Sequence, residues 1–263
     1  FGSARTHPNH PAFMAAEAFG REIAKAGWMV ITGAGSGIME AGHLGAGRDN
    51  SFGLNILLPF EQSANPVVHG DPKLMTLRYF FTRKLMFIKE SDAVALFPGG
   101  FGTHDEAFEA LTLIQTGKSH IFPIVLVDEP GGTYWKAWQR FIEAELLDRG
   151  YISPADRFLY KVTDSVEEAV RTVTGFYRVY HSMRYVRGDL VLRLRSKLPD
   201  NLFQRIQTSF GDILAGGRFQ QTEALPEEAN EPNLAAMPRL KFRFDRHMIG
   251  RLRQLIDTIN DDV

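Results

Sequence analysis

The chain has 263 residues, of which 44% are hydrophobic and 23% charged, and its formal net charge is -1. This length suits one large domain or one domain with an appendage, and the balanced charge gives no reason to expect a nucleic acid or a membrane as partner. No apolar run is long enough to span a bilayer, and the absence of cysteine excludes disulfides, thiolate metal ligands and cysteine nucleophiles.

The first residues carry no secretory signal pattern, so we expect a cytoplasmic protein. Phe1-Gly2-Ser3 is interpreted as the end of a strand whose beginning precedes Phe1. Hydrophobic periodicity and turn residues then predict the following elements in chain order: a helix from Pro11 to Gly27, a strand over 28–32, a glycine turn over 33–37, a helix over 38–46, a strand over 54–58 stopped by Pro59, and a polar loop over 60–72.

The middle of the chain continues the alternation of helices and strands. The expected elements are a mostly helical segment over 73–89, a strand over 93–97, a helix from about 101 to 120, a strand over 121–127, a helix over 134–147, and a helix from a cap at Asp164 or Ser165 to about Tyr177. Strands that alternate with helices of this length indicate βαβ units. We therefore expect an α/β fold with a parallel sheet flanked by helices.

The remainder of the chain has a different pattern of apolar residues, which predicts a small α+β appendage. Its expected elements are a half-buried strand over 190–194, a helix from Asp200 ended by Gly216-Gly217, an acidic loop over 223–232, a second half-buried strand over 240–244, and a helix from His247 to Ile259. The arginines of 178–195 and 239–253 alternate with apolar residues, so they are interpreted as the exposed sides of strands. We expect two domains, 1–177 and 178–263.

The most informative stretch is Phe97-Pro98-Gly99-Gly100-Phe101-Gly102-Thr103-His104-Asp105-Glu106, which lies between an apolar strand and a helix. Glycines let the backbone approach a ligand closely, and the first N–H groups of a helix point at an anion. Thr103 and Glu106 add polar groups beyond what a tight turn needs. The stretch therefore predicts a phosphate site with a carboxylate beside it.

A second glycine turn, Gly33-Ala34-Gly35-Ser36-Gly37, also joins a strand to a helix. It lacks the spacing of G-x-G-x-x-G, and the region about 20 residues further on contains no acidic residue to hold a ribose, which disfavours NAD. No Walker A loop is present either. By itself, the turn fits a packing role and a ligand contact equally well. All three polar turns, at 2–6, 33–37 and 98–106, follow strands, so we expect them at one edge of the sheet.

Other polar residues are less specific. Spacing alone favours a solvated cationic pair for Arg83-Lys84 over compensation of a bound phosphate. His43 and His104 are candidate general acids, although isolated histidines seldom have that role. The remaining loop histidines lack the spacing of metal ligands. We expect no metal site and no cofactor.

These motifs together resemble the LOG (Lonely Guy) family, whose members were long labelled lysine decarboxylases. Pro98 to Glu106 matches its P-G-G-x-G-T-x-x-E signature, and Arg83-Lys84-Leu85-Met86 matches its R-K-x-M element. Gly33 to Ala41 is similar to its G-G-G-x-G-I-M-E-A turn, with alanine at the second glycine. The opening Phe1 to Arg5 is similar to its F-G-S-x-R. The resemblance covers about residues 1–175.

The resemblance implies a Rossmann-like sheet and a phosphoribohydrolase that cleaves the N-glycosidic bond of AMP or of cytokinin riboside monophosphates. It also implies a homodimer or larger homo-oligomer, with Arg83 and Glu106 as the catalytic pair. The residues expected to bind substrate or phosphate are Ser3, Gly35, Ser36, Gly37, Lys84, Gly99, Gly100, Gly102 and Thr103. His104 stands where many members have leucine. The alternatives are a non-catalytic nucleotide-binding module and a hydrolase of other purine or pyrimidine monophosphates. Lysine decarboxylation would need a pyridoxal phosphate Schiff base, for which the sequence shows no suitable lysine.

Overall fold

The computed structural model describes residues 1–57 and 63–261, which divide into two compact units. The first unit comprises residues 1–113, 122–152 and 160–173, and the second comprises 114–121, 153–159 and 174–263. Leu58 and Pro59, the end of one expected strand and its stop, lie outside the described residues. Across the described parts of the chain, no helix has the length and apolar character needed to cross a membrane.

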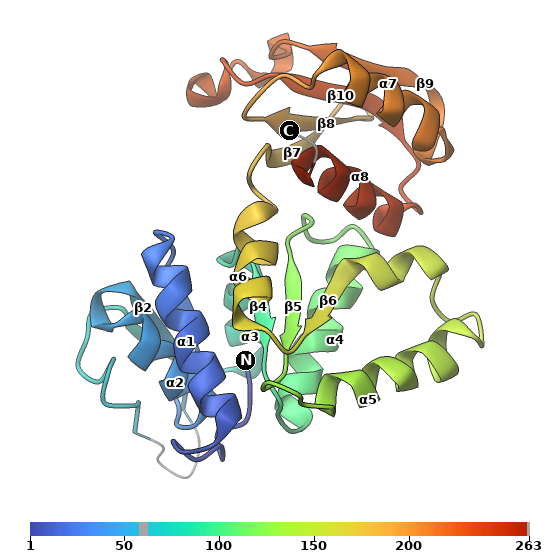
Figure 1. The fold of residues 1–263 in the computed structure, drawn as a ribbon. Helices are drawn as coiled ribbons and strands as arrows, with labels where there is room; N and C mark the ends of the chain where they lie inside the picture. The colour runs from blue at the N-terminus through green and yellow to red at the C-terminus, as the bar shows by residue number, and fades with distance from the viewer. Residues whose placement is uncertain (58–62, 262–263) are drawn as a thin grey trace. The chain divides into compact units, whose positions relative to one another are not determined.

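The first unit alternates strands and helices (Figure 1). In chain order its main elements are α1 (Pro11–Lys25), β1 (Val30–Thr32), α2 (Ile38–Ala46), β2 (Ser51–Ile56), β3 (Leu74–Leu77), α3 (Phe80–Lys89), β4 (Val94–Leu96), α4 (Phe101–Gln115), β5 (Ile124–Val127), α5 (Tyr134–Phe141), β6 (Tyr160–Thr163) and α6 (Val166–Gly175). A π-helical segment, Ile142–Leu147, continues α5, and a 3₁₀ turn spans Arg48–Asn50, whereas the 3₁₀ turn Pro154–Leu159 belongs to the second unit.

All strand pairs of the first unit are parallel, in the orders β1-β2-β3 and β4-β5-β6. The segment before α1 extends the second of these sheets along β4. The Phe1 nitrogen donates to the Ala95 carbonyl at 2.8 Å, the Phe97 N–H donates to the Phe1 carbonyl at 2.9 Å, and the Ser3 N–H donates to the Pro98 carbonyl at 3.1 Å. The predicted α/β fold with parallel sheets flanked by helices is confirmed.

Burial explains why these short strands form. All four residues of β5 are buried, as expected for a parallel strand covered on both faces. The apolar side of α1, including Phe13 and Ile23, packs into one core with Phe97, Val125 and Val173. This core fixes the strand ends from which the polar turns of the unit emerge.

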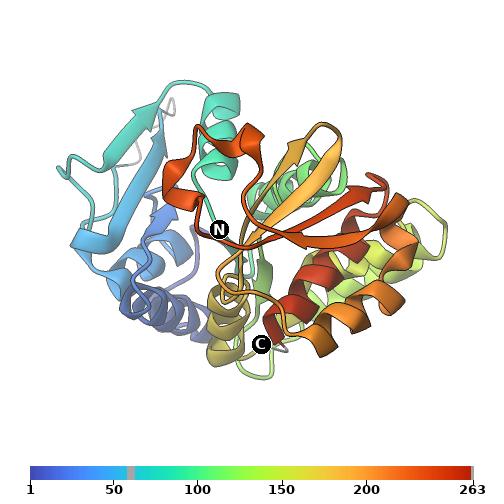
Figure 2. The ribbon, with the colours of Figure 1, turned by 90° about the horizontal axis from the view of Figure 1, so that it is seen from above.

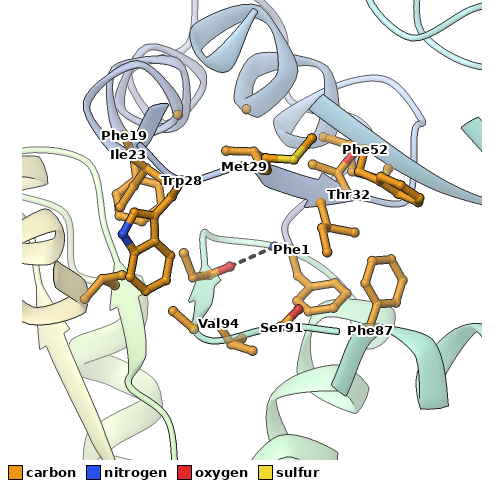
Figure 3. A pocket seen from close by; sticks show the side chains of 18 of the residues that line it. Phe1, Phe19, Ile23, Trp28, Met29, Thr32, Phe52, Phe87, Ser91 and Val94 are labelled. Atoms are coloured by element: carbon orange, nitrogen blue, oxygen red, sulfur yellow. Dashed lines mark hydrogen bonds between the residues drawn. The ribbon is translucent and has the colours of Figure 1, made fainter. Parts of the chain in front are cut away.

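An apolar cavity of about 780 Å³ lies between β1 and β4, and Figure 3 shows the side chains around it. Phe1, Phe19, Trp28 and Phe87 are among the residues that line it, and the hydrogen bond from Phe1 crosses its edge. The cavity is a gap in the sheet region and contains neither Arg83 nor Glu106.

The second unit contains an antiparallel sheet with the strand order β7-β8-β10-β9. Its elements are β7 (Tyr180–Val186), β8 (Asp189–Leu194), α7 (Asp200–Ser209), β9 (Leu214–Thr222), β10 (Arg239–Phe244) and α8 (Ile249–Asp261), with 3₁₀ turns at Gly211–Ile213, Pro226–Glu228 and Pro232–Leu234. Figure 2 shows α8, in dark red, beside the strands of this sheet. The Asn260 side chain of α8 accepts from the N–H groups of Val179 and Tyr180 at 2.9 and 3.1 Å. The helix end is thereby tied to the start of β7.

Several sequence predictions were wrong in detail. Residues 74–77 form β3 rather than a helix, because parallel hydrogen bonding to β2 takes up their backbone groups. Gly216 and Gly217 do not end a helix. They lie in β9 opposite a register irregularity of β10, where glycine accommodates a bulge. Three further strands, β6, β7 and β9, were not predicted.

The arginines of the second unit also differ from the prediction. Arg193 and Arg239 are buried, with 4% and 0% of their surface exposed, and are not on the exposed sides of strands. Glu228, in the acidic segment predicted as a loop, accepts from Arg193 Nε at 2.8 Å and from Arg239 Nε at 3.0 Å. The two guanidinium groups therefore have a buried countercharge that the alternating pattern did not reveal.

Replacing this countercharge should destabilise the second unit. Glu228→Gln leaves two buried guanidinium groups without their shared carboxylate, which typically costs about 3–5 kcal/mol. Its neighbour Glu227 pairs with the exposed Arg187, so Glu227→Gln should change the free energy of unfolding by less than about 1 kcal/mol. Denaturant unfolding followed by circular dichroism measures both values, and equal stability of the two variants would contradict the assignment.

The stabilising effect of Glu228 should also depend on pH. Burial opposes ionisation of Glu228, but the hydrogen bonds from Arg239, Leu225 and Arg193 outweigh it and lower the pKa of this carboxyl from 4.5. A carboxylate with a lowered folded pKa contributes stability above its unfolded value, and this contribution is lost as pH falls through the folded value. The stability difference between wild type and Glu228→Gln should therefore be full at pH 7 and shrink below about pH 4.5.

Candidate functional site

A cavity of about 890 Å³ lies beyond the carboxyl ends of the parallel strands of the first unit. Its walls come from the segment 1–5, the turn after β1, the end of β2, one face of α3, and the loop 99–106 that opens α4. In parallel α/β sheets this edge is the usual position of a ligand. Residues from all three polar turns that follow strands in the sequence thus line one cavity.

The loop before α4 presents backbone N–H groups to this cavity. The N–H groups of Thr103 and His104 donate to the Gly100 carbonyl at 3.1 and 3.2 Å, which closes the first turn of the helix. The N–H groups that precede them have no acceptor within the helix, so they can bind an anion. A Cβ at Gly99 would lie 2.1 Å from Thr103 Oγ1, whereas a Cβ at Gly100 or Gly102 would meet no atom within 4 Å. The loop is packed at Gly99 and open at the next two glycines.

The turn over 33–37 supports the cavity more than it lines it. Gly37 has φ 64°, which favours glycine, and the Ile38 N–H donates to the Ser3 carbonyl at 3.0 Å. Ser36 Oγ donates to the Ala4 carbonyl at 2.8 Å. These bonds fix Ser3 at the cavity wall, while Ser36 and Gly37 themselves are not among its lining residues.

Glu106 and Arg83 face the cavity from α4 and α3. Only 6% of Glu106 is exposed, and neither its Oε2 nor Arg83 Nε has a hydrogen-bond partner within residues 1–57 and 63–261. Burial raises the pKa of Glu106, as do the nearby charges of Glu109 and Asp105, while Lys84 and Arg83 act in the opposite direction. The site therefore holds a carboxylate with one oxygen free to accept a proton or contact a ligand.

Arg83 stacks against aromatic rings rather than projecting into water. Its guanidinium carbon lies 5.1 Å from the ring centre of Phe80 and 5.9 Å from that of Phe87. Burial lowers the pKa of Arg83, and the charge of Glu106 acts against this effect. An arginine remains charged under these conditions, so Arg83 is a fixed cation close enough to Glu106 for their charges to interact.

Lys84 points away from the cavity and toward α4. Its Nζ lies 2.7 Å from Asp105 Oδ2, 2.5 Å from Glu109 Oε2 and 3.8 Å from Glu106 Oε2. It is not among the cavity's lining residues. Of the residues predicted from sequence, Ser3, Gly35, Arg83, Gly99, Gly100, Gly102, Thr103 and Glu106 line the cavity, whereas Ser36, Gly37 and Lys84 do not.

The two candidate histidines have structural partners. His43 is fully buried and lies 3.1 Å from Thr32 Oγ1 and 3.2 Å from the Phe52 carbonyl, outside the cavity. His104 lines the cavity, with its Nε2 2.7 Å from the Tyr134 hydroxyl. That hydroxyl donates to the Gly99 carbonyl, so the histidine and the tyrosine brace the glycine loop. Burial lowers the pKa of His104, which favours its neutral form.

Sequence reasoning missed several residues that shape the site. Tyr134 lies in a helix predicted only for its apolar face, and its contact with Gly99 spans 35 positions of the chain. Asn65 donates to the Gly35 carbonyl at 3.0 Å, and Asn55 lines the cavity at the end of β2. In the sequence, Asn55 is a polar residue near the end of a strand and Asn65 lies in a polar loop, and nothing else marks either residue as part of a site. The described part of the chain contains no cluster of acidic and histidine residues suited to a metal ion.

Comparison with known proteins gave consistent matches. A family model described as possible lysine decarboxylase matches residues 34–173. Two relatives named cytokinin riboside 5′-monophosphate phosphoribohydrolase are each 32% identical to the chain. The one from Mycobacterium tuberculosis aligns over 58% of this chain and 80% of its own length, and the one from Rhodococcoides fascians over 60% and 79%. Among solved structures, the Moco carrier protein from Chlamydomonas reinhardtii has a TM-score of 0.41 and 23% identity, over 66% of this chain and 91% of that one.

The open position of Gly100 yields a direct test of the anion site. Gly100→Ala should leave the fold intact, because the added methyl meets no protein atom, but it should fill the space where an anion would approach the loop. Loss of a charge-assisted contact predicts ribose 5-phosphate binding weakened by about tenfold or more, measured by titration calorimetry. Gly211→Ala, at an equally open position in the second unit, is the control and should bind normally. Unchanged affinity in Gly100→Ala would show that the loop does not hold the phosphate.

Proposed function

Because the chain belongs to the LOG family, whose model is described as possible lysine decarboxylase, we propose that it is a nucleoside 5′-monophosphate phosphoribohydrolase. Its substrates would be cytokinin riboside monophosphates or AMP, and its products the free base and ribose 5-phosphate. The observation that carries the proposal is the buried Glu106, which lines a cavity at the start of α4 and has one carboxylate oxygen without a hydrogen-bond partner in the described part of the chain. This arrangement suits cleavage at a sugar held by its phosphate.

The geometry supports a definite division of roles. The 5′-phosphate would bind the open N–H groups around Gly100 and Gly102, with Thr103 beside them. The ribose then lies over α4, within reach of Glu106 in the first turns of the same helix. Phosphate and carboxylate would thus be positioned by one rigid element, which fixes the distance between the anchor and the reacting carbon.

The reaction breaks the bond between C1′ and the base nitrogen, and the bonding electrons leave with the base. The sugar passes through an oxocarbenium-like state, which the Glu106 carboxylate stabilises electrostatically. A water oxygen forms the new bond to C1′. One water proton is taken up by Glu106 and the departing base gains a proton in its place, so the net change is the addition of one water. Arg83 would compensate the negative charge of the phosphate or steady Glu106.

Lysine decarboxylation has less support from the geometry. A pyridoxal Schiff base needs an unprotonated lysine directed into a ligand cavity. Lys84 is instead bound by Asp105 and Glu109, and although burial lowers its pKa, these hydrogen bonds and the neighbouring carboxylates raise it above its usual value. The family description therefore does not fit the surroundings of this lysine.

The homo-oligomer implied by the resemblance is also proposed here. Tyr79, Phe80, Phe81 and Leu85 are more than half exposed around the start of α3, and Phe101 at the cavity mouth is 96% exposed. Exposed apolar side chains grouped in this way are typical of surfaces that bind protein. Sedimentation of a monomer at micromolar concentration would contradict the proposal.

The substrate class is tested by a product assay. The protein is incubated with AMP, a cytokinin riboside monophosphate, GMP, UMP and CMP, and free base is separated by chromatography. Release of adenine or cytokinin base with an equal amount of ribose 5-phosphate supports the proposal. Release of guanine or a pyrimidine instead would keep the hydrolase but change the base that it accepts. Saturable binding of these nucleotides without release of any base would instead indicate a binding module.

Replacing the proposed catalytic carboxylate should separate activity from stability. Glu106→Gln removes the charge that stabilises the ribosyl cation, so turnover should fall by about 10²–10⁴-fold. The raised pKa of Glu106 means that its ionised form costs stability above its ordinary pKa of 4.5. The variant should therefore melt at the same temperature as wild type or higher at pH 7.

Turnover by initial rates and melting by calorimetry measure both effects. Glu90→Gln, an exposed site at the end of α3, serves as the control and should retain wild-type turnover. Near-normal turnover in Glu106→Gln would remove this residue from the mechanism.

A further inference from the structure

Lys84, to which the proposed reaction gives no role, lies at the centre of an acidic cluster. Asp105, Glu106 and Glu109 come from the first turns of α4, and Lys84 and Arg83 of α3 bring positive charge to this cluster. Like charges four residues apart, such as Asp105 and Glu109, destabilise a helix when they are uncompensated. The Lys84 ammonium, with 17% of its side chain exposed, lies between these two carboxylates.

Lys84 Nζ lies closer to Asp105 and Glu109 than to Glu106. Those to Asp105 and Glu109, 2.7 and 2.5 Å, are hydrogen bonds, whereas the 3.8 Å to Glu106 Oε2 exceeds hydrogen-bond length. Coulomb attraction at 3.8 Å is still strong in a partly buried site, because it falls only with the inverse of distance. Glu106 therefore receives the field of the ammonium while its oxygen stays unoccupied.

We propose that Lys84 is a positioning residue that keeps Glu106 ionised, and that Asp105 and Glu109 hold its ammonium beyond hydrogen-bond distance of Glu106, so that the carboxylate is not tied up in a direct ion pair. This inference rests on the proposed function for its role in turnover, but not for the ionisation of Glu106 itself. It reassigns Lys84 from the phosphate contact expected from sequence to an electrostatic role.

The charge balance around Glu106 gives the direction of each change. The charged groups with the largest effects on it are Lys84 and Arg83 from α3 and Glu109 and Asp105 from α4. Removing the positive charge of Lys84 leaves two uncompensated carboxylates and disfavours ionised Glu106. Removing the negative charge of Glu109 does the opposite, and it also frees the ammonium to approach Glu106.

Two variants with opposite predicted effects test the proposal. The acidic limb of the pH profile of kcat/KM should move to higher pH in Lys84→Met and to lower pH in Glu109→Gln. In Lys84→Met, kcat/KM at pH 6 should fall about tenfold further below wild type than it does at pH 8. The substrate phosphate also titrates near pH 6, at about the same value for every variant, so it cancels in the comparison.

Two more variants separate charge from folding. Lys84→Arg keeps the charge and should return the limb toward the wild-type position. Lys89→Met removes an exposed lysine from the same helix and should leave the limb unmoved. A purely structural role for Lys84 would lower activity equally at all pH values, and a profile of that shape, or shifts of the same sign in Lys84→Met and Glu109→Gln, would overturn the proposal.

A titration without substrate keeps the inference distinct from the proposed function. The carboxyl ¹³C signal of Glu106, assigned by its loss in Glu106→Gln, reports ionisation directly by NMR. Its midpoint should rise in Lys84→Met and fall in Glu109→Gln even if no nucleotide is hydrolysed. Unmoved midpoints would refute the role of Lys84, whereas moved midpoints without base release would refute only the hydrolase.

Discussion

The burial of the Glu106 carboxylate between α3 and α4 is the constraint on which the site depends. A carboxylate with 6% exposure is costly to ionise, and the positive charges of Lys84 and Arg83 on α3 reduce this cost. The side chains of Arg83 and Lys84 must therefore lie opposite Glu106. Since Glu106 lies in the first turns of α4, directly after the glycine loop, this contact also ties α3 to the wall of the cavity that the loop forms.

The parallel sheet supplies the rigid frame for this alignment. Strands such as β5 are buried on both faces, and the loops that follow the strands carry the polar groups. Hydrogen bonds from Ile38 to Ser3 and from Tyr134 to Gly99 then fasten these loops to each other and to α5. Because the bracing residues come from distant parts of the chain, the loop geometry is a property of the folded unit and not of the motif alone.

Local patterns predicted much of this architecture, since glycine turns and apolar runs act over short distances. The helix over 38–46 and the loop with Glu106 were found in this way. Local patterns could not reveal which strands and which charged side chains pair over long distances in the chain. The pattern over 73–89 did not reveal that β2 would draw residues 74–77 into a strand, and alternation did not show that Glu228 would reach buried Arg193 and Arg239. Lys84 was predicted as a ligand contact, but the carboxylates that hold it come from α4, 21 and 25 positions further along the chain.

The central claim is that a 5′-phosphate anchored at the start of α4 places the ribose against Glu106. The most direct measurement compares the rate of adenine release from AMP with that from adenosine at equal concentration. If the phosphate anchor positions the sugar, kcat/KM for adenosine should be lower by at least about 10³-fold, because the anchoring energy is lost in the transition state. Equal rates from the two substrates would contradict the account, since the ribose would then reach Glu106 without the glycine loop.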